Sequence, residues 1–94
     1  MRNVSSSRAT QTFERLVKRQ AFRKGARDLF QGLGFRSDYE FWEEAYQYNY
    51  ERGRRFATML HTAGVAWDGV SRFPYHAHVW VCKNADDVIG ELNV

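Results

Sequence analysis

Two histidines and the single cysteine of the chain lie close together in residues 75–83, YHAHVWVCK. If this segment is a strand, alternate side chains project from one face, which places His76, His78 and Cys82 on the same side. A structural zinc normally needs four nitrogen or sulfur ligands at recognised spacings, and a cysteine nucleophile needs a base and an oxyanion hole. The sequence marks neither set, so we expect no metal, no cofactor and no enzymatic activity.

Cationic side chains are concentrated in the first third of the chain. Residues 1–36 hold nine basic and two acidic residues, a formal net charge of +7, whereas residues 37–94 hold five basic and nine acidic residues, a net charge of −4. Such an uneven charge steers an acidic partner, and cationic arms repeated at each helical turn suit phosphate contacts. An ordinary solvated face would have the same residues. The basic candidates for partner binding are Arg15, Lys18, Arg19, Arg23, Lys24 and Arg27.

The apolar residues of the predicted helix over residues 10–32 change direction along its length. At about 100° per residue, two apolar sets point roughly 150° apart. Either the helix breaks between Gln20 and Gly25, or one straight helix packs its second half into the core and offers its first half to a partner. The first set completes the candidate partner-binding surface, and the two sets are Phe13, Leu16 and Val17, then Phe22, Ala26, Leu29 and Leu33.

The strongest helical pattern covers residues 37–61. Ser37 and Glu40 have the spacing of a capping box, and Gly64 suits the position just after the helix. Asn49 and Gly53 lie in the middle of the apolar face, where large side chains are expected. A glycine there predicts a close approach of another element, either within the chain or across a homodimer. The face itself comprises Trp42, Tyr46, Asn49, Gly53, Phe56 and Leu60.

The composition after Gly64 favours strands. Residues 65–67 and 70–73 flank Asp68-Gly69, a sequence typical of a hairpin turn. Pro74 predicts that any strand there lies at an edge, and residues 75–83 alternate as a strand does. Asn84 suits the cap of a last short helix from Ala85 to Leu92.

Together these patterns predict one α+β domain spanning residues 1–94. We expect two packed helices, at about 10–32 and 38–62, with a small antiparallel β element at about 65–83 and a short C-terminal helix. Residues 1–9 are polar and expected to be flexible. Gly32 and Gly34 predict a tight connection, and hence an antiparallel helix pair. A lone cysteine and the absence of a long apolar run favour the cytoplasm and no membrane contact.

Two functions fit these features. The first is a small non-catalytic cytoplasmic protein that modulates or inhibits a larger, nucleic-acid-processing machine by binding an acidic protein surface. Its basis is the redirected patch of Phe13, Leu16 and Val17 beside arginines, since interface centres favour aromatic residues and arginine. A homodimer would use the same features. The alternative is direct RNA or DNA binding through the basic N-terminal helix, which predicts a steep dependence on salt.

Overall fold

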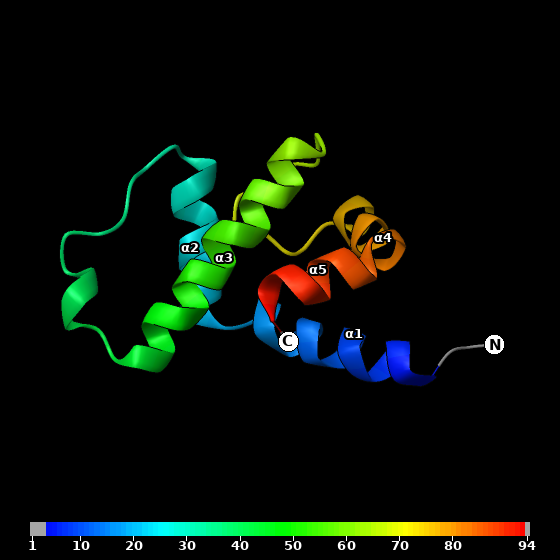
Figure 1. Ribbon diagram of the computed structural model, residues 1–94. Helices are drawn as coiled ribbons and strands as arrows, with labels where there is room; N and C mark the ends of the chain where they lie inside the picture. The colour runs from blue at the N-terminus through cyan, green and yellow to red at the C-terminus, as the bar shows by residue number, and fades with distance from the viewer. Residues whose placement is uncertain (1–3, 94) are drawn as a thin grey trace.

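The computed structural model describes the backbone of residues 4–93 and the side chains of residues 11–93. All regular structure within these residues is helical, so the predicted α+β class is wrong. None of the described helices is long and apolar enough to cross a membrane. The elements, drawn in Figure 1, are α1 (Val4–Val17), α2 (Gln20–Phe30), the 3-10 turn η1 (Tyr39–Phe41), α3 (Glu44–Thr62), α4 (Tyr75–Lys83) and α5 (Ala85–Leu92).

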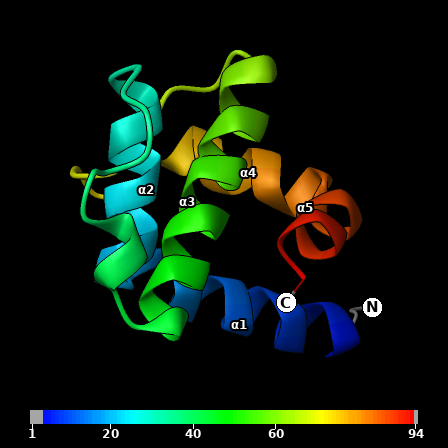
Figure 2. The ribbon, with the colours of Figure 1, turned by 60° about the vertical axis from the view of Figure 1, so that its left-hand side comes forward.

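The fold is built on the crossing of α2 and α3, which lie side by side in both ribbon views (Figures 1 and 2). A Cβ atom added to Gly25 of α2 would collide with the carbonyl oxygen of Tyr50, and one added to Gly53 of α3 would collide with that of Phe22. Each glycine thus admits the backbone of the opposite helix. The predicted close approach at Gly53 is confirmed, and its partner is a helix of the same chain.

The two crossing helices run in the same direction, so the predicted antiparallel pairing is wrong. The first residues of α2 and α3 line one concavity. The last residues of both helices, including Phe30 and His61, line another, so the two helices begin at the same end of the pair. The connection over residues 31–43 explains this result. It is too long to be a tight turn and runs back along the helix pair, at the left of Figure 1, before α3 begins.

The N-terminal helical region is interrupted at Lys18 and Arg19, earlier than the predicted break between Gln20 and Gly25. Arg19 is extended, with φ −70° and ψ 137°. This bend turns the first apolar set and most of the second toward one core, although the two sets point in different directions on a straight helix. Leu33 of the second set lies beyond α2 and is exposed. The helix also begins at Val4 and not at about residue 10. Residues 4–9 of the segment expected to be flexible form its first turns, and residues 1–3 lie outside the described residues.

The helix predicted over residues 38–62 begins later than expected, at Glu44. The capping box of Ser37 and Glu40 does not form, because η1 intervenes and Trp42 is extended, with φ −80° and ψ 156°. The end of the helix is as predicted. Gly64 has φ +74°, and the N–H groups of Gly64 and Val65 donate to helix carbonyls in the pattern of a Schellman motif.

The predicted β element over residues 65–83 is absent from the described chain. Residues 75–83 form α4, in which Ala77 and Val81, four residues apart, are buried. Nine residues with alternating apolar side chains also satisfy this helical spacing, which explains the error. Asp68 does make a turn by accepting hydrogen bonds from the N–H groups of Val70 and Ser71, but no strands flank it. The predicted C-terminal helix is confirmed, with bounds Ala85–Leu92.

An aromatic cluster fills the space between α1, α3 and the chain before α4. Phe13 lies 5.1 Å from Phe56 and 6.0 Å from Phe73, measured between ring centroids. Phe73 in turn lies 5.0 Å from Trp67. Smaller apolar side chains from α4 and α5, including Val81 and Val88, close the same core. The core therefore draws on every α-helix and on the irregular segment 65–74.

We predict that Gly25→Ala and Gly53→Ala each lower the free energy of unfolding by roughly 3 kcal/mol, because the added methyl group forces the two backbones apart. Gly90→Ala is the matched control, since nothing lies within 4 Å of a Cβ at that helical position. It should raise stability by up to about 1 kcal/mol. Urea unfolding followed by circular dichroism measures all three. Equal stabilities for the three variants would contradict the close crossing.

Candidate functional site

The predicted apolar binding patch belongs to the core. Phe13, Leu16 and Val17 expose only 3%, 5% and 9% of their surface. Phe13 also contacts the ring of Phe22 at 6.4 Å between centroids, so the two apolar sets meet each other. The expectation that these three side chains contact a partner is therefore corrected, because the bend at Lys18 and Arg19 directs them inward.

The six predicted basic residues divide into two groups. Those of α2 are half-buried and contact the rest of the chain. The Arg23 guanidinium donates to the carbonyl of Ser71 at 2.7 Å, the Lys24 ammonium lies 5.4 Å from the centre of the Trp42 ring, and Arg27 lies 3.9 Å from the Asp28 carboxylate. The second group is Arg15, Lys18 and Arg19. Their side chains are exposed and make no hydrogen bond or ion pair with another described residue.

These three exposed cations line a concave surface between the α1–α2 junction and the start of α3. The backbones of these two segments lie near each other at the lower left of Figure 2. The concavity has a volume of about 770 Å³, and a second one of about 410 Å³ adjoins it and reaches Arg52. We call the two together the basic groove. The lining of the larger part is Arg15, Lys18, Arg19, Gln20, Ala21, Trp42, Glu43, Ala45, Tyr46 and Asn49.

The basic groove combines cations with aromatic rings. Glu43 is the only carboxylate among the described residues that line it. Trp42 and Tyr46, both half-buried, lie with their ring centroids 5.0 Å apart and their planes at 72°. Asn49 adds an amide, whose oxygen lies 3.5 Å from the Arg52 guanidinium. The surface can therefore hold an anion and also contact a flat apolar group.

Two other concavities of the described chain lack this character. One of about 570 Å³ at the far ends of α2 and α3 is mostly apolar, with His61 at its rim. Another of about 920 Å³ along α3 has Glu51 and Glu91 facing Arg54 and Arg55, so its charges balance. Of these concavities among the described residues, the basic groove alone carries an excess of unpaired cations.

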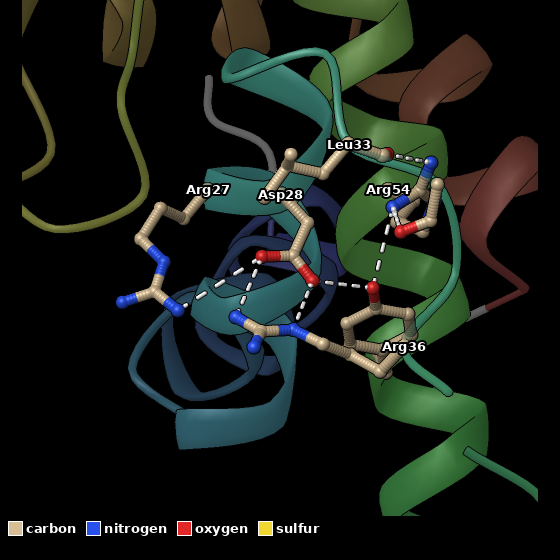
Figure 3. Close-up of polar contacts among 7 residues, drawn as sticks. Arg27, Asp28, Leu33, Arg36 and Arg54 are labelled. Atoms are coloured by element: carbon tan, nitrogen blue, oxygen red, sulfur yellow. Dashed lines mark hydrogen bonds and ion pairs between the residues drawn. The ribbon is translucent and has the colours of Figure 1, made fainter. Parts of the chain in front are cut away.

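A buried carboxylate holds the connection between α2 and α3 in place (Figure 3). Asp28 is fully buried and accepts hydrogen bonds from Arg36 Nε at 2.8 Å, from Arg36 Nη2 at 3.0 Å and from the Tyr50 hydroxyl at 2.5 Å. Arg54 donates to the Tyr50 oxygen at 3.2 Å and to the carbonyl of Leu33 at 2.8 Å. This network joins α2, α3 and the connection at one point.

The same network shifts the ionisation of its members. Burial raises the pKa of Asp28, but the hydrogen bonds from Arg36 and Tyr50 outweigh burial and hold this pKa below its usual value. Burial and the hydrogen bond to Asp28 raise the pKa of Tyr50. At neutral pH the carboxylate is therefore ionised and the phenol is protonated. With its oxygens occupied, Asp28 has a structural role and is not available as a base.

The residues that anchor the α2–α3 connection also contact a ring of the groove. The Tyr39 hydroxyl donates to the Glu51 carboxylate, and Gln47 Nε2 donates to the Tyr39 carbonyl at 2.7 Å. Trp42 contacts both Tyr39 and Tyr50, with ring centroids 5.5 Å and 5.1 Å away. Trp42 is thus held in position at the edge of the groove by residues that also anchor the connection.

The predicted histidine and cysteine cluster does not exist as a shared face. On a helix, His76 and His78 are separated by about 200°, whereas a strand would align them. Cys82 is exposed and unpaired. Among the described residues, no three His, Cys, Asp or Glu side chains come together in a way that could hold a metal ion.

The sequence indicates the cations of the groove but not the position of its rings. The helical pattern puts Trp42 and Tyr46 on the apolar face of one long helix. They lie at the groove because η1 and the extended Trp42 precede α3. The polar Asn49 in the middle of that face is the signal that could have indicated that part of the face borders solvent. Nothing in the spacing of Asp28 and Arg36 marks the buried network.

We predict that Asp28→Asn lowers the free energy of unfolding by about 2 kcal/mol at pH 7, because the Arg36 guanidinium loses its charged partner. Since folding lowers the pKa of Asp28, the carboxylate contributes its full stabilisation above about pH 4, near the unfolded-state value. The contribution disappears as the pH falls through the folded-state pKa. The difference in melting temperature between wild type and Asp28→Asn should therefore become smaller below about pH 4.

Glu40→Gln serves as the control for this measurement, because Glu40 is an exposed carboxylate in the same connection. Glu40→Gln should have the same melting temperature as wild type at pH 7 and at pH 3. A gap between wild type and Asp28→Asn that is the same at pH 3 and pH 7 would show that the ionised carboxylate is not what stabilises the connection.

Comparisons with models of known families, with curated proteins and with solved structures found no match.

Proposed function

We propose that this protein is a non-catalytic binding protein that holds a nucleic-acid strand in the basic groove, mainly through its phosphates. The observation that carries the proposal is the convergence of Arg15, Lys18 and Arg19 on one concave surface, where internal partners do not neutralise them. Cations placed in this way supply most of the affinity for nucleic acid and require no particular base sequence.

The charge distribution supports the same proposal. The cations of α2 also contribute to the field around the groove, because Asp28 is the only acidic residue of α2. A field of one sign over a concave surface raises the rate at which an oppositely charged partner arrives. Residues that contact the chain internally can therefore assist association without touching the ligand.

A protein partner is the second candidate function, as part of the modulation of a larger machine. The patch first assigned to it is buried, but other apolar side chains are exposed around the α2–α3 connection, with Phe30 at 55% and Phe41 at 85%. Large exposed aromatic residues are common at protein interfaces. Binding by these residues would depend little on salt, which separates it from the first candidate.

We further propose that the protein works in the cytoplasm. Its single cysteine, Cys82, is a free and exposed thiol. Free thiols are typical of reducing compartments.

We predict that replacing Arg15, Lys18 and Arg19 together by glutamine weakens binding to a mixed-sequence oligonucleotide at least about tenfold at low salt. For wild type, three phosphate contacts to a single strand give a slope of about −2 for log K against log salt, and the variant should show a slope near zero. Fluorescence anisotropy between about 50 and 200 mM salt measures both quantities.

The matched control replaces Arg55, Arg72 and Lys83 by glutamine. These three residues are exposed and lie outside the basic groove. Their replacement removes three positive charges, as in the groove variant. The control should keep most of the affinity and the slope. Equal losses in both variants would mean that total charge matters and the groove does not. No binding by wild type at the lowest salt would overturn the proposed function.

A further inference from the structure

We infer that the basic groove selects single-stranded nucleic acid over duplex, with Trp42 and Tyr46 as the side chains that stack on an unpaired base. The inference rests on the proposed function and adds the class of strand that is bound. It uses the rings of the groove, which phosphate binding alone leaves without a role.

The two kinds of side chain come from different walls of the groove. Arg15, Lys18 and Arg19 belong to the α1–α2 junction, whereas Trp42 lies in the extended segment just before α3 and Tyr46 lies in the first turn of α3. A strand that lies along the junction would place its phosphates against the cations and turn its bases toward the rings. In a duplex the base faces are covered by their neighbours, so the rings could not reach them.

The size of the groove fits this arrangement. Its larger part is an open concavity of about 770 Å³, which has room for a base with its sugar. Selection against a duplex therefore rests on the rings and not on the size of the concavity. The adjoining part of about 410 Å³ continues past Asn49 to Arg52, along which a strand could extend.

The rings are held in place before any ligand arrives. Trp42 contacts Tyr39, Tyr46 and Tyr50, and the Lys24 ammonium lies 5.4 Å from the centre of its ring. A fixed ring loses little freedom when a base stacks on it, so more of the stacking energy appears as affinity. The neighbouring Phe41 is 85% exposed and lines none of the concavities described above, so it cannot replace Trp42.

The test compares a labelled single strand with a hairpin duplex of the same composition, as RNA and as DNA, by fluorescence anisotropy at low salt. Wild type should bind the single strand at least about tenfold more tightly, because base stacking on aromatic side chains contributes that much. Trp42→Leu should lose about tenfold for the single strand and nothing for the duplex. Trp42→Phe, which keeps a ring, should retain most of the affinity.

Phe41→Leu is the matched control, an aromatic residue beside Trp42 but outside the groove, and it should bind like wild type. Tyr46→Leu is the second variant. Tyr46→Leu provides the test if circular dichroism shows that Trp42→Leu does not fold. The only ring contact of Tyr46 in the described chain is with Trp42, so its loss should disturb the fold less. Binding of the single strand should also quench tryptophan fluorescence, and Trp42→Phe should reduce that quenching.

The outcomes distinguish selection of single strands from nucleic-acid binding as such. Equal, salt-dependent affinities for single strand and duplex, with no effect of Trp42→Leu or Tyr46→Leu, would overturn the inference and leave the proposed function standing. Failure of wild type to bind either ligand at low salt would overturn both. Tight binding of an acidic peptide in place of either nucleic acid would also overturn both and favour a protein partner.

Discussion

The contact between the backbones of α2 and α3 is the constraint on which the rest of the structure depends. Gly25 and Gly53 lie on opposite helices, and each leaves room for the backbone across from it. Any side chain at either position would separate the helices and open the core around Phe22 and Phe56. The parallel direction of the pair then requires the chain to return along its full length over residues 31–43 before α3 starts. The position of the groove follows from that return, because it brings Trp42 beside the beginning of α2.

A return segment of this kind cannot be held by a hydrophobic core alone, since it lies on the surface and many of its side chains are exposed. The buried carboxylate of Asp28 solves this problem by binding Arg36 from the middle of the segment and Tyr50 from α3. Removing a carboxylate from water is costly, but the two charge-assisted hydrogen bonds from one guanidinium and the phenol compensate for that cost. The same Tyr50 ring supports Trp42. The position of Trp42 at the groove is therefore linked to an ion pair that lies outside the groove.

The sequence was informative where one residue type has a single physical explanation. Gly53 predicted a close approach and Gly64 predicted a helix end, and both are confirmed: a Cβ at Gly53 would meet the backbone of Phe22, and Gly64 has a positive φ that favours glycine. It was misleading where a pattern has two solutions. Alternation over residues 75–83 fits a strand and also the helix α4 with Ala77 and Val81 inward. The direction of the helix pair depended on a turn between Gly32 and Gly34 that the return segment does not make. Among the site residues, exposed cations could be read from the sequence, whereas the rings could not, because their position depends on that segment.

The division among the basic residues has a wider consequence for reading charge along a helix. Six cations recur between residues 15 and 27, yet the half that belongs to α2 contacts the chain itself, because two irregular segments pack against that helix. Arg23 holds the carbonyl of Ser71, and Lys24 lies over Trp42. These two contacts leave the charges of Arg23 and Lys24 in place, since carbonyl groups and rings do not neutralise them, whereas Arg27 lies beside the Asp28 carboxylate. Under the proposed function, the field of the whole basic region would attract the ligand over a distance, while Arg15, Lys18 and Arg19 at the α1–α2 junction would contact it directly. Long-range attraction and local contact would then depend on different residues, and only the local contact would depend on the shape of the groove.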